Sequence, residues 1–598
     1  MKPTNIRNFA IIAHIDHGKS TLADQLMALT QTVSERDQQA QLLDDMAVEQ
    51  AHGVTVKSRT VRNFYTDSDG QEYEYNLIDT PGHVDFAYEV SKSLAASDGA
   101  ILLVDATQGV QAQTVANFRL AQANHLAILP VVNKIDSPAA DIERTIAQIR
   151  QLSPALATVD PLRISAKTGQ GVPAVLAAIK DVFPAPTGST VAPLKALVFD
   201  SLYDSFKGVI AYVRLAAGTL TPGMDNLLMA NATTFTNKAI GAFTPDMTPV
   251  SQLGVGEVGY VVTGLKDPQA LRVGDTLTSQ SEPTAQPFPG YQPAQSLVFA
   301  GFYPKNKKIR ELTLAIEKLA LNDSSFHFQA EVSEALGPGV RCGFLGIFHL
   351  QIIRERLVTE YGLDVLTTAP NVTYRVHLKG VEQPKLINNP INFPDFDQIE
   401  MTEEPLVKAT ITTPNDLLGA VMQLADAHKG QLVDMGNQGD LIELQYRLPL
   451  AEIAYDFFNT LKSLTHGYAT LTTAFDGYDL ADVVKVEVHL NYARVDALSF
   501  IVHRADAPDV AQQLVHKLKY VVPRKLYPMP AQAVVEGKPL ARVDIPPLRK
   551  NAAVNGEQRS VSKKQALLRR QSVNKRQAAH SDLQLSQEVF NAILDLSL

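Results

Sequence analysis

Residues 13–20 read Ala13-His-Ile-Asp-His-Gly-Lys-Ser20, and this stretch decides how the first part of the chain is interpreted. It follows the apolar run Asn8–Ala13, which has the composition of a buried strand, and a helix is expected to begin near Lys19. Such a loop wraps backbone N–H groups around phosphate oxygens at a helix N-terminus. Lys19 can reach the β- and γ-phosphates, and the Ser20 hydroxyl can ligate Mg²⁺. Ala13 replaces the first Gly of the usual pattern, so a chance Gly-Lys-Ser remains the alternative.

A second motif, Asp79-Thr-Pro-Gly82, follows a strand that ends at Ile78. The Asp79 carboxylate can hold Mg²⁺ through water, and the Gly82 amide can meet the γ-phosphate. An isolated Asp-x-x-Gly tetrapeptide is a common turn. Its weight as a nucleotide motif therefore comes from its place after a strand and after the phosphate loop.

Two later motifs suit a guanine base. Asn133-Lys-Ile-Asp136 ends an apolar strand, and the Asp136 side chain can accept two hydrogen bonds from a base with an N1–H and an exocyclic amine, which guanine has and adenine lacks. Ser165-Ala-Lys167 follows a fourth strand and can close the base pocket with a backbone amide and an aliphatic stem. An Asx-turn is the alternative for the first of these motifs. All four motifs fall at the carboxyl ends of strands, where parallel α/β sheets bind ligands, and together they predict GTP binding.

Two single residues are predicted to act at the γ-phosphate. Thr55 lies between the phosphate loop and Asp79, and its hydroxyl can reach Mg²⁺ only when the γ-phosphate is present, so its segment can act as a switch. The alternative is an ordinary β-branched strand residue. His83 directly follows the Asp-Thr-Pro-Gly turn, and we predict that it orients a water for in-line attack on the γ-phosphorus. A single His is more often structural, but this position favours catalysis.

Length and composition limit the class of protein. The chain has 598 residues, enough for about four domains, and its one cysteine, Cys342, excludes an intramolecular disulfide and a Cys-based zinc site. We expect no transmembrane segment and no secretory signal. The net charge is −9, yet Arg549–Arg576 holds nine Lys or Arg residues and one acid. This basic tail predicts contact with a polyanion, either nucleic acid or an anionic membrane surface, and a solvated helix end is the alternative.

Changes of pattern divide the chain into five predicted units. Residues 1–184 alternate strands and helices and form the GTP-binding domain, and residues 190–283 have the short strands and turns of a β-barrel. Residues 294–378 and 403–478 each read as a strand, a helix, two strands, a helix and a strand, which predicts two ferredoxin-like α/β sandwiches. Residues 480–598 form a last unit that ends in the basic tail.

The stretches Ala13–Ser20 and Asp79–Phe86 resemble those of the translational GTPases. Further motifs along nearly the whole chain are similar to those of the elongation factor 4 (LepA) family, namely Ile6–Leu22, Leu319–Asp323, Arg341–His349, Thr367–Pro370, Gly467–Ala469, Arg494–Leu498 and Leu548–Asn551. The resemblance implies a multidomain α/β protein with a P-loop GTPase domain, a β-barrel, two α/β sandwiches, of which the second resembles the elongation factor G C-terminus, and a LepA-type C-terminal domain. Only the segment 380–400 separates the sandwiches, which argues against elongation factor G and the ribosomal-protection proteins.

The resemblance also implies an activity. It implies a GTP hydrolase, stimulated by the 70S ribosome, that contacts ribosomal RNA and tRNA, uses GTP, GDP and Mg²⁺, and promotes back-translocation and the fidelity of elongation under stress. It further implies a monomer of bacterial type in the cytoplasm, with a peripheral contact to the cytoplasmic face of the membrane. The chain shows no lipidation motif or amphipathic anchor, so such a contact would be electrostatic and made by the tail.

Residue roles follow from the motifs and the resemblance. The residues expected to bind GTP are Asp16, His17, Gly18, Lys19, Ser20, Thr21, Asp79, Gly82, Asn133, Lys134, Ile135, Asp136, Ser165, Ala166 and Lys167. The expected Mg²⁺ ligands are Ser20, Thr55 and, through water, Asp79. Ile15 and Val54 match the apolar pair that flanks the catalytic His in resting translational GTPases, which implies slow intrinsic turnover. The candidate RNA contacts are the tail bases Arg549, Lys550, Arg559, Lys563, Lys564, Arg569, Arg570, Lys575 and Arg576.

Two segments depart from the family pattern. Residues 49–53 read Glu-Gln-Ala-His-Gly where the family usually has Glu-Arg-x-Arg-Gly, and residues 552–557 replace its usual Lys-Cys-Tyr-Gly-Gly-Asp stretch. The departures suggest a diverged second copy in its host. They also motivate a competing hypothesis, a GTP-dependent ribosome-binding module with little turnover, which the intact Ser20, Thr55 and His83 oppose.

Overall fold

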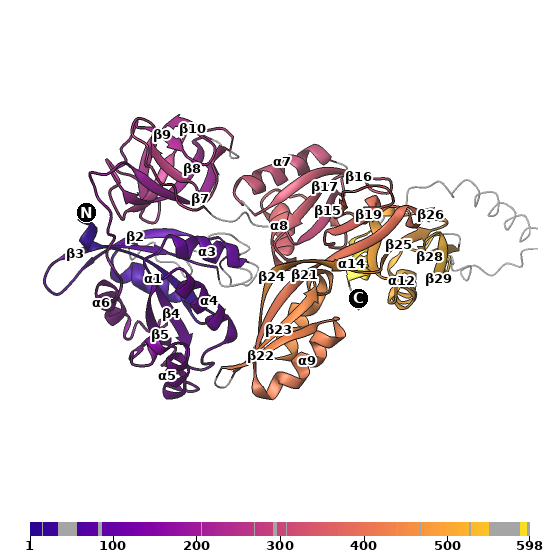
Figure 1. Ribbon diagram of the computed structural model, residues 1–598, viewed down its shortest axis with the longest axis horizontal. Coiled ribbons are helices and arrows are strands. Elements are labelled where there is room, and N and C mark those ends of the chain that lie inside the picture. The colour runs from indigo at the N-terminus through magenta and orange to yellow at the C-terminus, as the bar shows by residue number, and fades with distance from the viewer. Residues whose placement is uncertain are drawn as a thin grey trace, which may run out of the picture.

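The computed structural model describes residues 1–14, 16–33, 49, 55, 57–81, 86–204, 206–267, 270–290, 296–306, 308–323, 325–438, 441–465, 468–525, 528–548 and 586–594. The described residues form five sheets. Figure 1 shows the N-terminal unit and the barrel unit at the left, followed toward the right by the two sandwiches and the C-terminal unit. This architecture confirms the predicted multidomain α/β fold. Among the described helices, none is both long and apolar enough to span a bilayer.

The N-terminal unit is built on a sheet with the strand order β2-β3-β1-β4-β5-β6. Its strands are β1 (Ile6–Ala13), β2 (Thr60–Thr66), β3 (Glu72–Ile78), β4 (Gly99–Asp105), β5 (Ala127–Asn133) and β6 (Leu162–Arg163). All neighbours pair in parallel except β2, which is antiparallel to β3. β1 and β4 are buried along their whole length, as their continuous apolar sequences predict.

Helices cover both faces of this sheet. They are α1 (Lys19–Leu29), α3 (Ala87–Ala95), α4 (Ala112–Ala123), α5 (Ile142–Gln151) and α6 (Val172–Val182). α1 and α6 pack against one face, and α3, α4 and α5 pack against the other. The unit is therefore doubly wound, which places the carboxyl ends of β1, β3, β4 and β5 along one edge.

The barrel unit is an antiparallel sheet in the order β10-β9-β14-β7-β8-β13-β11-β12. Its strands are β7 (Lys195–Asp204), β8 (Gly208–Ala217), β9 (Asp225–Leu228), β10 (Thr233–Thr236), β11 (Ala239–Phe243), β12 (Met247–Pro249), β13 (Val258–Val262) and β14 (Thr276–Ser279). A shared apolar joint that includes Ile78, Leu197, Phe199 and Val258 packs this unit against the N-terminal unit. The joint places β7 close to the nucleotide-motif edge of the first sheet.

The first sandwich has the sheet order β16-β17-β15-β18. Its elements are β15 (Val298–Pro304), α7 (Ile309–Leu321), β16 (His327–Ser333), β17 (Gly337–Phe344), α8 (Ile347–Thr359) and β18 (Val365–Thr367). Their order along the chain is the strand, helix, two strands, helix and strand that the sequence predicts. Both helices pack on one face of the sheet around a core that includes Phe302, Ile316 and Leu357.

The second sandwich has the sheet order β20-β19-β21-β23-β22, and β24 also pairs with β21. Its elements are β19 (Tyr374–Leu378), β20 (Lys385–Ile387), β21 (Ile399–Pro414), α9 (Leu418–Ala427), β22 (Gln431–Gln438), β23 (Leu441–Pro449), α10 (Leu450–Glu452), the π-helical turn Ile453–Phe457, α11 (Phe458–Leu464) and β24 (Thr470–Leu480). β19 lies in the range 294–378 assigned to the first sandwich, but it pairs with β21. The reason is that Tyr374 and Val376 are buried in the core of the second sandwich.

The C-terminal unit has the sheet order β26-β25-β28-β29, and β27 pairs with β25 on the same side as β26. Its elements are β25 (Val483–Leu490), β26 (Ala493–Arg494), β27 (Phe500–His503), α12 (Ala507–Val521), β28 (Met529–Val535), β29 (Lys538–Ile545) and α14 (Gln587–Leu594). α12 and α14 pack together over the sheet. The basic residues of the tail, 549–576, lie outside the described residues.

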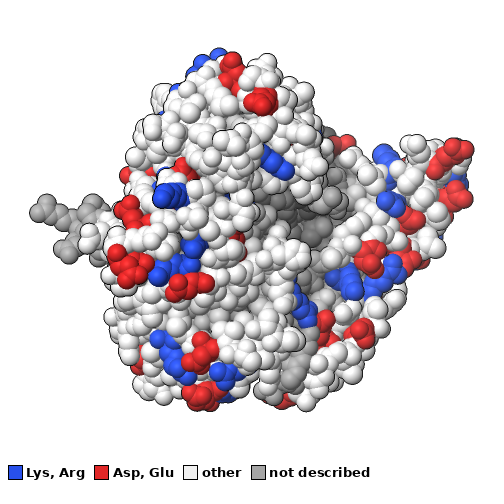
Figure 2. All heavy atoms as spheres, turned by 60° about the vertical axis from the view of Figure 1, so that its left-hand side comes forward, with Lys and Arg blue, Asp and Glu red and all other residues white. Residues whose placement is uncertain are grey.

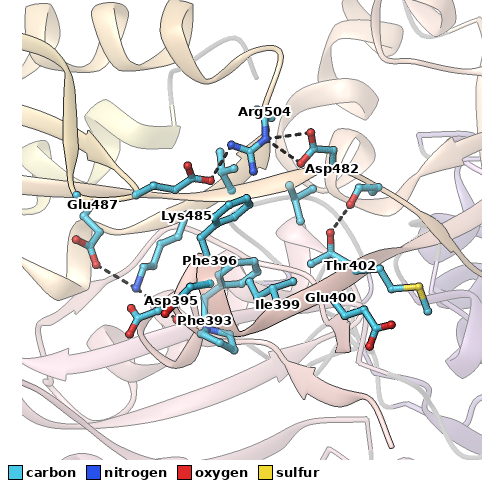
Figure 3. Close-up of a pocket in the computed structure, with 18 of the residues that line it drawn as sticks. Phe393, Asp395, Phe396, Ile399, Glu400, Thr402, Asp482, Lys485, Glu487 and Arg504 are labelled. Atoms are coloured by element: carbon cyan, nitrogen blue, oxygen red, sulfur yellow. Dashed lines mark hydrogen bonds and ion pairs between the residues drawn. The ribbon is translucent and has the colours of Figure 1, made fainter. Parts of the chain in front are cut away.

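The segment between β20 and β21 helps to join the second sandwich to the C-terminal unit. It borders a cavity of about 900 Å³ that is shared with β25, the end of β27 and the β28–β29 turn (Figure 3). Arg504 lines this cavity, where its guanidinium donates hydrogen bonds to Asp482 at 3.0 Å and to Glu536 at 2.7 Å. Its guanidinium also lies 5.0 Å from the centre of the Phe396 ring. The segment is therefore part of an interdomain contact and more than a tether.

A buried aspartate fastens the C-terminal unit to the first sandwich, and its loss should loosen this joint. Asp496 is 3% exposed and accepts hydrogen bonds from the Ser333 hydroxyl at 2.7 Å and from the amides of Glu334 and Ala335 at 2.6 and 3.1 Å. Asp496→Ala leaves these donors without their acceptor, at an expected cost of about 3 kcal/mol in unfolding free energy. Calorimetry should show an earlier melting transition, with Asp496→Asn less affected because it keeps one acceptor oxygen. An unchanged thermogram for the Ala variant would contradict this role.

Candidate functional site

The phosphate loop joins β1 to α1 as the sequence predicts. α1 begins at Lys19, and Gly18 caps it in the left-handed region with φ +96°. Asp16 also has a positive φ, 62°. The loop therefore turns back sharply before the helix, so that the first amides of α1 face the space at the strand edge. This is the geometry in which a helix N-terminus binds an anion.

Three of the predicted residues meet at the Lys19 ammonium. Its Nζ donates to Thr55 Oγ1 at 2.7 Å and to Asp79 Oδ1 at 2.8 Å. Asp79 is 0% exposed, and Lys19 and Thr55 are also buried. The Thr80 hydroxyl anchors the Asp79 loop by donating to the Ile11 carbonyl of β1 at 2.7 Å. Lys19, Thr55 and Asp79, which the sequence predicts to serve as the phosphate-loop Lys, the switch Thr and the motif carboxylate, are thus gathered at one point beside the helix N-terminus.

Asn133 links the phosphate loop to the predicted base pocket. Its Nδ2 donates to the His17 carbonyl at 2.9 Å, and its Oδ1 accepts from the Ala166 amide at 2.9 Å. Asp136 is exposed, and a hydrogen bond from Ser165, helped by the nearby Lys167 charge, lowers the pKa of its carboxyl. The Asp136 side chain is therefore an ionised, acceptor-only group on the loop after β5.

Asp105, at the end of β4, ties two of the motifs together although the sequence analysis did not select it. Its carboxylate pairs with Lys134 Nζ at 2.8 Å, and its amide donates to His17 Nδ1 at 3.3 Å. Lys134 Nζ also donates to the Asp16 carbonyl at 2.7 Å. Burial, with a smaller contribution from His14, lowers the pKa of His17 to about 3, so the ring stays neutral. Asp105 lies at the carboxyl end of an apolar strand, and this position was the signal in the sequence that could have identified it.

The remaining candidates are only partly described. Ser20 lies in the first turn of α1, Thr21 is exposed beside it, and Ile135 and Lys167 lie in the loops after β5 and β6. Gly82, His83, Ile15, Val54 and the nine tail bases lie outside the described residues. Within the described ranges, no three His, Cys, Asp or Glu side chains are grouped so that they alone could hold a metal ion.

Comparison with known proteins assigns three parts of the chain. Residues 4–185 match the elongation factor Tu GTP binding domain, residues 401–489 the elongation factor G C-terminus, and residues 490–595 the GTP-binding protein LepA C-terminus. A relative from Lactiplantibacillus plantarum, named elongation factor 4 2, is 64% identical over 100% of both chains. This chain belongs to the elongation factor 4 family. It is a GTP-binding and GTP-hydrolysing translation factor that acts on the ribosome.

Other elongation factor 4 proteins are similar over the same length. The one from Bacillus subtilis is 45% identical, with 100% of this chain and 97% of the relative covered. The one from Geobacillus thermodenitrificans is 47% identical, with 99% and 97% covered. A solved structure from Thermus thermophilus matches 80% of this chain and 97% of its own with a TM-score of 0.58 at 19% identity, which shows likeness of fold alone.

Gly18 is expected to be required for nucleotide binding by this elongation factor 4. Its φ of +96° disfavours a side chain, and a Cβ there would lie 2.5 Å from Asn133 Nδ2. Gly18→Ala should therefore strain the phosphate loop or displace Asn133, and weaken GTP binding about 100-fold, which corresponds to roughly 3 kcal/mol. Equilibrium titration with a fluorescent GTP analogue measures the loss. Gly70→Ala, at a positive φ with open space around its Cβ, is the matched control and should bind GTP normally.

Proposed function

We propose that this elongation factor 4 hydrolyses GTP on the 70S ribosome and, in its GTP-bound state, moves tRNAs backwards in badly translocated complexes. The observation that carries the hydrolytic part is the convergence of Thr55 and Asp79 on the Lys19 ammonium, at 2.7 and 2.8 Å. These are the groups that γ-phosphate recognition requires, and they come from three separate segments. The tRNA movement rests on membership of the family.

The donor atoms at this point fit Mg²⁺, which prefers oxygen ligands and keeps several waters. Ser20 and Thr55 would offer hydroxyl oxygens, and the Asp79 carboxylate would hold one of the waters. When bound, Mg²⁺ would neutralise charge on the β- and γ-phosphates. Lys19 would then turn from its protein partners to the phosphates. Because Thr55 would be a ligand only with GTP, its segment would report whether the γ-phosphate is present.

The other predicted residues take roles around this centre. Amides of the loop from Asp16 to Thr21 would surround the phosphates, since the His17 ring itself faces Asp105. Asp136 would select guanine, with Lys134, Ile135 and residues 165–167 enclosing the base. His83 would orient the attacking water, assisted by the Gly82 amide. Ile15 and Val54 would restrain His83 until the ribosome is bound.

We propose that the five units together form the surface that binds the ribosome. We infer boundaries at 1–184, 190–283 and 480–598, and we assign β19 and β20 to the fourth unit because β19 pairs with both β20 and β21. The matches at 4–185, 401–489 and 490–595 support the first, fourth and fifth of these units.

The basic tail is proposed to bind ribosomal RNA or tRNA. On the face shown in Figure 2, described Lys and Arg side chains are interspersed with Asp and Glu. The residues 549–576 instead hold nine bases and one acid. Binding through RNA phosphates should therefore weaken steeply with salt.

We propose that the protein is a monomer in the cytoplasm. Extraction of membranes with salt would test whether it also makes a peripheral, electrostatic contact with the membrane.

The deciding experiment is GTP hydrolysis by the purified chain with and without 70S ribosomes. Strong stimulation supports the proposed GTPase. Residues 49–53 depart from the family pattern, and this departure favours a second candidate, a ribosome-binding module with little turnover of GTP. That candidate predicts GTP-dependent ribosome binding without stimulated hydrolysis. Toeprinting of tRNA position on a post-translocation complex then tests backward movement, and an unmoved toeprint in the presence of GTP would contradict that part of the proposal.

A further inference from the structure

The end of α7 in the first sandwich touches the chain just after the switch Thr. Lys57, two residues beyond Thr55, donates its Nζ to the Asn322 carbonyl at 3.3 Å and to the Ser201 carbonyl at 3.2 Å. The Asn322 side chain accepts from the Tyr203 amide at 2.8 Å. The segment that follows Thr55 is therefore held jointly by the barrel unit and the first sandwich.

The next residue, Asp323, is joined to the start of α8 by a partly buried hydrogen bond. His349 is 1% exposed, and its Nε2 lies 3.0 Å from Asp323 Oδ2. Its Nδ1 accepts from the Leu345 amide at 3.2 Å, so in the neutral ring Nε2 carries the proton and donates to Asp323. Burial opposes ionisation of Asp323, but His349 and hydrogen bonds from Ser325 outweigh it and hold the pKa of the carboxyl below its usual range.

His349 and its neighbour on α8 also touch the segment that follows His83. Phe86, three residues beyond His83, is buried with its ring centre 6.1 Å from those of Phe348 and His349. Ile352 completes this small apolar contact. α3 of the N-terminal unit begins right after Phe86. In Figure 1 it lies on the side of that unit that faces α8 of the first sandwich.

We propose that Asp323 and His349 are positioning residues for GTP hydrolysis. Asn322 and Asp323 are adjacent, so one helix end links Lys57 on one switch segment to Phe86 on the other through the fixed His349 ring. A contact that only buried apolar area would need no ionised carboxylate beside an oriented imidazole, since burying such groups costs free energy unless they are paired. The pair would hold the first sandwich in the one orientation in which the Thr55 and His83 segments are both in place. This inference rests on the proposed ribosome-stimulated hydrolysis.

The test separates hydrogen bonding from packing at position 349. His349→Phe keeps a ring against Phe86 but removes both hydrogen bonds, whereas His349→Gln can still donate to Asp323 and accept from Leu345. We expect the Phe variant to lower the ribosome-stimulated kcat about 30-fold, with the KM for ribosomes and the Kd for GTP little changed. The Gln variant should recover most of the rate. Asp323→Ala combined with His349→Phe should be no slower than either alone, because both remove the same link.

Lys57→Met is a second variant away from the Asp323–His349 pair. It keeps the aliphatic stem of Lys57 but removes the donor to the Asn322 and Ser201 carbonyls, and it should also lower kcat. Glu443→Gln is the matched control, since it removes the charge of the carboxylate that joins the second sandwich to Arg119 on the N-terminal unit at 2.6 Å, a pair that involves neither Lys57 nor Phe86. Its rate should match the wild type. Normal rates for His349→Phe and Lys57→Met, or a Gln variant as slow as the Phe variant, would overturn the proposal. An unstimulated wild type would instead overturn the proposed function itself, and this inference with it.

Discussion

His83→Ala is expected to lower the ribosome-stimulated kcat for GTP hydrolysis about 1,000-fold. His83 comes directly after the Asp79–Gly82 motif, whose carboxylate contacts Lys19 at 2.8 Å. A residue that orients water for in-line attack lowers the free energy of the transition state and contributes little to the binding of the nucleotide. The loss should therefore appear in kcat, while the Kd for GTP and the affinity for ribosomes stay the same. Single-turnover hydrolysis with saturating ribosomes measures it.

His83→Gln is the informative companion of this variant. A Gln side chain can still hydrogen-bond to water, so its rate should lie between those of the wild type and the Ala variant. Without ribosomes the three proteins should hydrolyse GTP at similarly slow rates, because the water-orienting group acts only after activation. A ribosome-stimulated rate that survives in His83→Ala would assign the water to another group and remove His83 from the mechanism.

The parts of the site that could be predicted are those that chemistry specifies over a few adjacent residues. A loop around phosphate needs Gly18, whose φ is +96°, and a cation such as Lys19 beside it. The buried strands β1 and β4 were also predictable, because strands covered on both faces have continuous apolar sequences. The β-α order then required the motifs to meet at one edge, which they do.

Contacts between residues far apart in the sequence could not be predicted in the same way. Asp105 meets His17 across 88 residues, and Asn322 meets Lys57 across 265 residues. No periodicity or spacing in the sequence joins positions so far apart. The assignment of β19 differed for a related reason, because the strand follows the first sandwich directly, but its Tyr374 and Val376 are buried in the second. Burial against a particular partner depends on the tertiary arrangement, which local pattern leaves open.

Asp136→Asn is expected to change the preferred nucleotide from GTP to XTP. The carboxylate is exposed, and the hydrogen bond from Ser165 lowers its pKa, so it only accepts hydrogen bonds near neutral pH. Guanine offers two donors to such a group, N1–H and the exocyclic amine. Asn presents one acceptor and one donor, which suits the N1–H and 2-oxo group of xanthine. GTP affinity should fall about 1,000-fold or more, as expected when a site built for a donor meets a mismatched group.

Competition between labelled GTP and unlabelled XTP measures this change directly, and ribosome-stimulated XTP hydrolysis should reappear in the variant because Lys19, Thr55 and His83 are untouched. Asp141→Asn is the matched control, since Asp141 caps α5 by accepting from the Arg144 amide at 3.1 Å, a role that Asn fills as well. It should leave GTP binding unchanged. If Asp136→Asn kept its affinity for GTP and gained none for XTP, the Asn133–Asp136 motif would be a turn with no role in base selection. Base selection would then have to come from residues 165–167, whose Ala166 amide already donates to Asn133.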